Sequence, residues 1–230
     1  MADFSLVETL DRLSRRQNFS TMAERTRKIY DRVSGIYPAS TFFFHSRAHR
    51  GLLNDAQIQD GMQILEVATG SGEMFRRLVG ANPTGATYGL DLSPNMAHRT
   101  QKHARRQFPK SSAHCQAVDV RHLPFRDESF DAVVCCYLLE LLATDDVRVT
   151  LKEFRRVLRP GGTLGMVLIG QSNPAYNRLY KVAGKIAPAF WGRQIEQRVA
   201  GMLEKNALRI ESDRYVTQSF YPSRILVARK

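Results

Sequence analysis

Cysteine is scarce in this sequence, and its placement excludes two kinds of site. There are three cysteines among 230 residues and no Cys-x-x-Cys pair. Cys135 and Cys136 are neighbours in a predicted strand, where consecutive side chains point to opposite faces, so we expect no disulfide framework. His45 and His49 are four residues apart, which suits a metal on a helix, but no third ligand lies nearby. We therefore expect no metal site.

Long hydrophobic runs are also missing. The longest covers residues 132–142, is interrupted by Glu140, and is shorter than the roughly 20 residues that a membrane-spanning helix needs. Residues 1–17 are amphipathic and lack the continuous apolar core of a signal peptide. We therefore expect a cytoplasmic protein, with one domain and a full hydrophobic core.

Acidic residues are in the minority, with 22 Asp and Glu against 34 Lys and Arg, a formal net charge of +12. The basic residues come in groups at 76–77, 99–110 and 155–159, mostly in predicted helices, which favours solvated helix faces. An anionic membrane or a nucleic acid is the alternative partner. No basic group coincides with a nucleic-acid-binding signature, so we expect no DNA partner and disfavour RNA. Peripheral membrane contact and the oligomeric state stay open.

Strand and helix patterns alternate along most of the chain. The predicted strands are 62–68, 86–91, 113–118, 130–137, 163–169, 208–217 and 220–228. The predicted helices are 1–17, 21–35, 46–57, 73–80, 94–107, 145–158 and 190–206, and the aromatic segment 36–47 is predicted to be a loop. Strands joined by helices are parallel, whereas the short Gln218-Ser219 connection makes the final pair antiparallel. The pattern predicts an α/β fold.

The run ILEVATGSGE, residues 64–73, predicts a buried strand, a glycine turn and the start of a helix. Gly70 and Gly72 permit a tight turn that a ligand can approach closely. A dinucleotide site needs a third small residue where this chain has Phe75, and no Gly-Lys-Ser/Thr follows, so NAD, FAD and an ATP-type loop are disfavoured. Asp91, about twenty residues on, suits ribose hydroxyls. The ligand expected from these residues is a nucleoside without phosphates.

Four blocks in this order, ILEVATGSGE, YGLDLSPNM, AVDVRHLPFRDESFDAVVCCYLL and LKEFRRVLRPGG, resemble class I S-adenosylmethionine-dependent methyltransferases. Ala68, where most of that class has glycine, and the segment 29–49 resemble the ubiquinone and menaquinone biosynthesis C-methyltransferases and related phospholipid N-methyltransferases. The resemblance implies a Rossmann-like, seven-stranded, mostly parallel sheet with an antiparallel last strand and helices on both faces. It also implies a helical cap over residues 1–60 and a donor-binding domain over 61–230.

The resemblance implies a set of residues that bind S-adenosylmethionine. They are Glu66, Ala68, Gly70, Ser71, Gly72, Asp91, Leu92, Met96, Asp119, Val120 and Cys136. In that family's pattern the glycines pass beneath the methionine and ribose moieties, Asp91 binds the ribose hydroxyls, and Asp119 accepts a hydrogen bond from the adenine amino group. The competing interpretations are a strand-end carboxylate for Glu66, a loop-capping acid for Asp119, core side chains for Leu92 and Met96, and a small buried hydrophobe for Cys136.

Methyl transfer from a sulfonium is an in-line displacement whose leaving thioether needs no acid, so positioning is the main task. A base is required only if the acceptor loses a proton, and His45 is the candidate by type and place. Tyr30, Tyr37 and Tyr137 are candidates for orienting the acceptor. The expected acceptor is a small apolar or aromatic molecule, quinone-like or lipid-like, because aromatic residues are dense at 42–44 and 176–191. The alternative is a donor-binding subunit without catalysis, associated with RNA.

Overall fold

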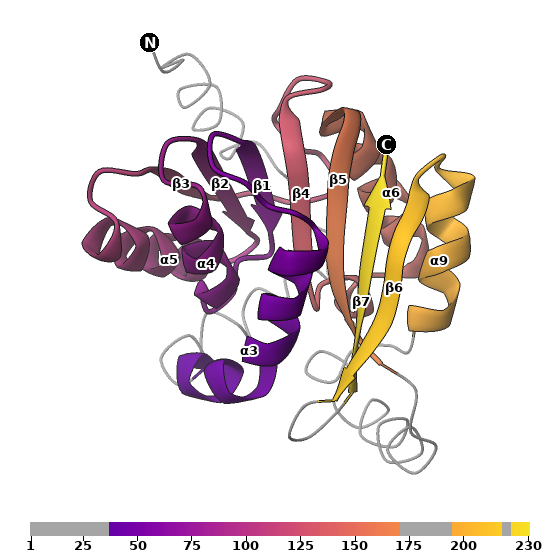
Figure 1. Ribbon diagram of the computed structural model, residues 1–230, viewed down its shortest axis with the longest axis horizontal. Helices are drawn as coiled ribbons and strands as arrows, with labels where there is room; N and C mark the ends of the chain where they lie inside the picture. Colours follow the sequence, from indigo (N-terminus) through magenta and orange to yellow (C-terminus); the bar gives the residue numbers. More distant parts are fainter. Residues whose placement is uncertain (1–36, 171–194, 218–221) are drawn as a thin grey trace.

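The computed structural model describes residues 37–170, 195–217 and 222–230, and for residues 37–45 only the backbone (Figure 1). Two predicted helices, 1–17 and 21–35, lie outside the described residues. The same is true of the Gln218-Ser219 connection, of Tyr30 and of the first residues of the predicted helix 190–206. Within the described ranges, no helix has both the length and the apolar character needed to cross a bilayer.

Seven strands of the described chain form one sheet, in the order β3-β2-β1-β4-β5-β7-β6 (Figure 1). They are β1 (Gln63–Val67), β2 (Ala86–Asp91), β3 (Ser112–Ala117), β4 (Phe130–Cys136), β5 (Leu158–Ile169), β6 (Arg209–Thr217) and β7 (Pro222–Arg229). Neighbours are parallel except at β7, which runs antiparallel to both β5 and β6. The predicted mostly parallel sheet with an antiparallel last strand is confirmed.

Helices cover both faces of the sheet (Figure 1). They are α3 (Tyr37–Asp55), α4 (Glu73–Ala81), α5 (Pro94–Gln107), α6 (Thr144–Val157) and α9 (Glu196–Lys205), with a short 3-10 turn η1 (Leu139–Leu141). One layer consists of α3, α4 and α5, and the other consists of α6 and α9. Ile64 packs in the core beneath α3 and α4, whereas Leu65, its neighbour, packs in the core beneath α6 and α9. A strand buried on both faces explains why apolar residues occupy consecutive positions here, interrupted only by Glu66.

The predicted loop over residues 36–47 is wrong, because α3 begins at Tyr37 and continues to Asp55. The prediction failed because Pro38 was interpreted as a loop residue. Proline is tolerated in the first turn of a helix, since an N–H group at that position would have no acceptor within the helix. Ala48 and Leu52 of this helix are buried in the same core as β5 and β7. This part of the predicted cap therefore packs directly on the sheet, while the division at residue 60 stays a prediction.

The strand predicted at 163–169 begins earlier, at Leu158. Leu158 pairs with Phe130 and Thr163 pairs with Ala132, so the segment between them is a bulge within β5 rather than a turn before it. Gly161 has φ +75° in this bulge, and its N–H donates to the Lys230 carbonyl at 2.9 Å. β5 therefore pairs with β4 on both sides of this bulge.

Glu140, in η1, is a carboxyl group buried in the interior. It is 2% exposed, and its Oε1 accepts a hydrogen bond from the Ile169 N–H at 2.6 Å, whereas Oε2 has no hydrogen-bond partner within the described ranges. Burial raises the pKa of Glu140 to about 7, and the charge of Glu196 adds to this rise. The hydrogen bond from the Ile169 N–H acts in the opposite direction and lowers the pKa. The folded protein therefore binds this proton more tightly than the unfolded chain, whose Glu titrates near 4.5.

Because the folded pKa is raised, this group's contribution to stability is fully present below pH 4.5 and is lost as pH rises through about 7. Glu140→Gln removes the titration but keeps a carbonyl for Ile169. We expect the free energy of unfolding of Glu140→Gln, relative to the parent protein, to rise by about 2 kcal/mol between pH 5 and pH 8. Urea unfolding at both pH values measures this, and an unchanged difference would contradict the buried, raised carboxyl.

Candidate functional site

The predicted donor-binding residues meet at the carboxyl ends of the parallel strands. β1 lies between β2 and β4, so the connections from β1 and β4 leave in opposite directions at this point. In open α/β sheets such a switch point opens a crevice that receives ligands. The segments that follow β1, β2, β3 and β4 therefore come together at one edge of the sheet, although they span residues 68–137 in the chain.

The loop after β1 turns sharply through three residues with positive φ: Ala68 (63°), Gly70 (49°) and Gly72 (74°). The Gly72 N–H donates to the Thr69 carbonyl at 2.8 Å, and the Thr69 N–H donates to the Leu90 carbonyl at 3.1 Å. These bonds fasten the turn to itself and to β2. Left-handed backbone is open to glycine without steric cost, which is why this loop needs glycine.

Ala68 carries strain that glycine would not, because a left-handed L-residue costs about 1–2 kcal/mol. Replacing Ala68 with glycine would remove this strain, but glycine also has a greater chain entropy in the unfolded state, which offsets part of the gain in stability. We therefore expect Ala68→Gly to raise the free energy of unfolding by about 0.5–1 kcal/mol, measured by urea denaturation. Ala207, at φ 51° after α9, is the matched control, and Ala207→Gly should give a similar gain. A loss at Ala68 with a gain at Ala207 would show that the Ala68 methyl group makes a packing contact worth more than the strain.

Asp91, at the end of β2, anchors two segments of the site. Its Oδ2 accepts a hydrogen bond from the Gly70 N–H at 2.7 Å, and its Oδ1 accepts one from the Ser93 N–H at 2.9 Å. The side chain is 8% exposed. The sequence predicted only the ribose role, which stays a prediction. The structure adds that this carboxylate also fixes the position of the glycine loop.

Ser93 begins α5 as a cap, with Pro94 in the first turn. The Ser93 hydroxyl accepts a hydrogen bond from the Met96 N–H at 3.1 Å. Met96 is 1% exposed and therefore part of the core, whereas Leu92 is partly exposed beside the site. Of the two residues predicted to flank the adenine, Leu92 is the more accessible to a ligand.

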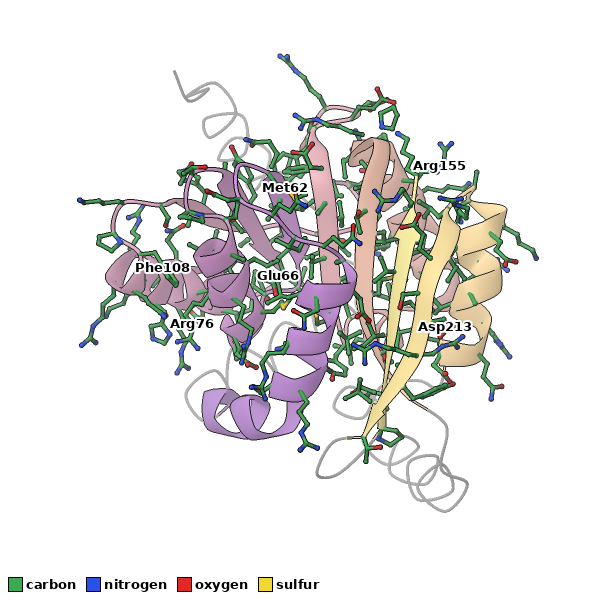
Figure 2. The ribbon with its side chains drawn as sticks, in the orientation of Figure 1. Met62, Glu66, Arg76, Phe108, Arg155 and Asp213 are labelled. Carbon is green, nitrogen blue, oxygen red and sulfur yellow. The ribbon has the colours of Figure 1, made fainter. Side chains whose placement is uncertain are left out.

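Glu66, at the end of β1, is the most deeply buried of the predicted site residues that carry a charge. It is 1% exposed, and its Oε2 has no hydrogen-bond partner among the residues that the structure describes. Figure 2 labels Glu66 near the middle of the molecule. Burial raises the pKa of Glu66 well above its usual value, and the nearby charges of Asp91 and Glu73 raise it further. A buried acceptor without a donor is costly. The amino or hydroxyl groups of S-adenosylmethionine would supply such a donor, so this part of the site fits the donor.

Asp119 is held by Arg121, two residues further along the chain. The Arg121 Nε lies 3.0 Å from Oδ1 and 3.1 Å from Oδ2, and the Arg121 N–H also donates to Oδ1 at 3.0 Å. Burial opposes ionisation of Asp119, but these hydrogen bonds outweigh it and lower its pKa. The Val118 N–H donates to the Asp91 carbonyl at 2.9 Å, which ties this segment to β2. Both the adenine role and the loop-capping role are compatible with this geometry, and the neighbouring Val120 is buried.

The end of β4 supplies Cys136 and Tyr137. Burial raises the pKa of the Cys136 thiol well above its usual value, and the charge of Glu66 raises it further, so it remains a neutral thiol. Tyr137 has φ 55°, and its hydroxyl shares a hydrogen bond of 2.8 Å with the Ser223 hydroxyl on β7. This arrangement supports the prediction that Cys136 lines the pocket and does not act as a nucleophile.

His49, on α3, is a buried residue of this region that the sequence did not single out for function. Its Nδ1 lies 2.9 Å from Glu73 Oε2, and its ring centroid lies 6.1 Å from that of Tyr137. Arg77 donates to Glu73 Oε1 at 2.9 and 2.7 Å. Burial opposes ionisation of Glu73, but the His49 and Arg77 hydrogen bonds outweigh it and lower its pKa. The contact between His49 and Glu73 joins α3 to the first residue after the glycine loop.

The signal in the sequence that could have pointed to His49 is its place one helical turn after His45. The sequence-based prediction took His45 as the candidate base instead. His45 and Tyr37 both lie in α3, where only the backbone is described, so their proposed roles stay predictions. Ser71 is buried within the glycine loop. Among the described residues, no three His, Cys, Asp or Glu side chains gather as metal ligands would.

Comparisons with known proteins agree with this geometry. Residues 64–162 match a family model described as a methyltransferase domain. The chain is 29% identical over 170 residues to a 2-phytyl-1,4-naphtoquinone methyltransferase of Nostoc punctiforme, covering 69% of this chain and 72% of that protein. It is 28% identical over 185 residues to a demethylmenaquinone methyltransferase of Staphylococcus aureus, covering 80% and 73%.

Two solved structures share the fold at low sequence identity. The N-methyltransferase NodS of Bradyrhizobium japonicum, in complex with S-adenosylhomocysteine, has a TM-score of 0.70 at 18% identity, covering 89% of this chain and 98% of that one. The cyclase SpnF has a TM-score of 0.72 at 16% identity, covering 90% and 96%. The Rossmann-like methyltransferase fold, the glycine turn and the sequence matches all indicate the same activity. This chain carries a methyltransferase domain and is an S-adenosylmethionine-dependent methyltransferase.

Proposed function

We propose that this enzyme methylates a small apolar or aromatic acceptor of the quinone type. The observation that carries the proposal is the match of 170–185 residues to proteins named as naphthoquinone and menaquinone methyltransferases, which extends beyond the segment 64–162. The fold alone would not support it, because SpnF, with the same architecture, is named a cyclase.

The proposed mechanism relies on positioning. S-adenosylmethionine supplies a methyl group on a positively charged sulfur, and that sulfur departs as a neutral thioether. In this proposal Gly70 and Gly72 let the backbone approach the donor, Asp91 binds the ribose hydroxyls, and Asp119 binds the adenine amino group. Holding donor and acceptor in line can supply about 7–11 kcal/mol of the barrier reduction.

The acceptor is proposed to enter over the ends of β4 and β7, where Tyr137 and Ser223 share their hydrogen bond. The neutral, partly buried thiol of Cys136 makes this part of the site less polar than the donor side. His45 would take up a proton if the acceptor has to lose one, and Tyr137 would orient an acceptor oxygen. A cytoplasmic location, with peripheral contact to an anionic membrane, belongs to the same proposal.

The test is transfer of labelled methyl from S-adenosylmethionine to three acceptors offered separately: a reduced prenylated naphthoquinone, a phospholipid and RNA. We expect label in the reduced naphthoquinone. Transfer to phospholipid or RNA in its place would overturn the quinone assignment. Binding of S-adenosylhomocysteine without transfer to any of the three would favour a donor-binding subunit without catalysis. For an RNA-associated subunit, affinity would fall steeply with salt, since each phosphate contact releases counterions.

A further inference from the structure

A basic hollow lies far from the donor-binding residues, among the ends of α6 and α9 and the last residue of the chain. Its volume is about 560 Å³. Five cations line it: Lys152, Arg155, Arg156, Lys205 and Lys230. Two acids, Asp127 and Glu128, complete its charged lining. The methyltransferase function uses none of these residues.

Two of the cations are paired with acids. Arg156 is shared between Asp127, 2.9 Å from its Nη1, and Glu153, 2.7 Å from its Nε. Lys230 Nζ lies 3.3 Å from Glu128. The other three cations have no such partner: Lys152, Arg155 and Lys205 are exposed and form no ion pair with any residue in the described ranges. Three uncompensated positive charges therefore face one hollow from two helices.

The helix ends reduce this charge but do not cancel it. α6 ends at Val157 and α9 ends at Lys205, and each helix C-terminus contributes roughly −0.5 of an elementary charge. With Glu153, which also pairs with Arg156, included, the remaining balance is about +1. The three unpaired cations each offer a charge-assisted hydrogen-bond donor, so an anion with several charged oxygens can bind more than one of them at once. Lysine ammonium groups and the planar arginine fork both bind phosphate oxygens well.

The hollow and the donor-binding loops lie at opposite edges of the sheet. Its residues lie at the amino ends of β4, β5 and β6, and the donor loops follow the carboxyl ends of β1 to β4. Figure 2 shows Arg155 at the end of the sheet where the chain terminates in Figure 1. A membrane docked at this edge would lie on the far side of the molecule from the donor site. A concave surface also fits a compact anion better than a plane of lipid headgroups.

We propose that this hollow is a binding site for a small, soluble, multiply charged phosphate compound of the diphosphate type. The proposal is independent of the acceptor assigned above. Because all three unpaired cations are exposed, binding will be weak and sensitive to salt.

The probe is inorganic diphosphate, titrated at low ionic strength against the full chain and followed by amide chemical shifts. We expect shifts at Asn206 and Ala207, which line the hollow. The variant Lys152→Glu/Arg155→Glu/Lys205→Glu should raise the Kd at least about tenfold. Lys205→Gln alone, at an exposed position, should raise it about threefold and keeps the test available if the triple variant does not fold.

The matched control is Lys102→Glu/Arg105→Glu/Arg106→Glu, which changes the net charge equally at exposed positions of α5. Its Kd should stay within about twofold, and both triple variants should still bind S-adenosylhomocysteine. Equal losses in the two triple variants would mean a general charge effect and would overturn the site. So would no saturable binding, or binding to phosphatidylglycerol vesicles that free diphosphate does not displace.

Discussion

Replacing Asp91 with alanine is expected to weaken binding of S-adenosylmethionine and S-adenosylhomocysteine by roughly 100-fold or more. Two effects add. The change removes a charged acceptor for the ribose hydroxyls, and hydrogen bonds to charged groups are worth about 1.5–3 kcal/mol each. It also removes the anchor that holds the Gly70 and Ser93 N–H groups at 2.7 and 2.9 Å. Calorimetric titration with S-adenosylhomocysteine measures the loss.

Asp60 provides the matched control for the anchoring effect. Its Oδ1 likewise accepts two backbone N–H groups, from Gly61 at 2.9 Å and Thr84 at 2.7 Å, but before β1 at the opposite edge of the sheet. Asp60→Ala should leave the affinity for S-adenosylhomocysteine within about twofold, because its loop is remote from the donor. If Asp91→Ala kept an affinity within threefold of the parent, the ribose assignment would be wrong.

Gly72→Ala is expected to lower the free energy of unfolding by about 2–4 kcal/mol and to abolish measurable donor binding. At φ 74° an alanine is strained, and its Cβ would lie 2.7 Å from Oγ1 and 3.0 Å from Cγ2 of Thr100. Thr100 is fully buried, so it has little room to move. Urea unfolding and calorimetric titration measure the two effects.

A double-mutant cycle separates the two causes. Thr100→Ala removes the two nearest atoms that the new Cβ would meet and leaves the Thr100 Cβ position at 3.2 Å, so Gly72→Ala/Thr100→Ala should recover most of the steric part and keep the backbone strain. Gly201→Ala is the control for glycine replacement in general: this residue lies within α9 with open space around its Cβ, and the change should stabilise by about 0.5–1 kcal/mol. Equal effects of Gly72→Ala and Gly201→Ala would refute the steric argument.

Local patterns in the sequence predicted most elements well. The strand at 86–91 and the helix at 94–107 have the predicted bounds, because Ser93 and Pro94 mark the helix start by local chemistry. The prediction failed at residues 37–47, where a proline in the first turn of α3 was interpreted as a loop signal. What decided that segment was the burial of Ala48 and Leu52 against β5 and β7, which is a tertiary effect.

The sequence by itself indicated a nucleoside ligand, because a glycine turn after a strand and an acid at the end of the next are local arrangements of backbone and spacing, and the resemblance of its four blocks indicated the class of the enzyme. Only the tertiary structure decided the partners: Asp91 with the Gly70 N–H, His49 with Glu73, and the unpaired cations around the basic hollow. These residues lie 21 or more positions apart in the first two cases. They meet because the sheet order 3-2-1-4-5-7-6 brings distant segments to one edge and lets helices bury apolar residues on both faces, which no local pattern encodes.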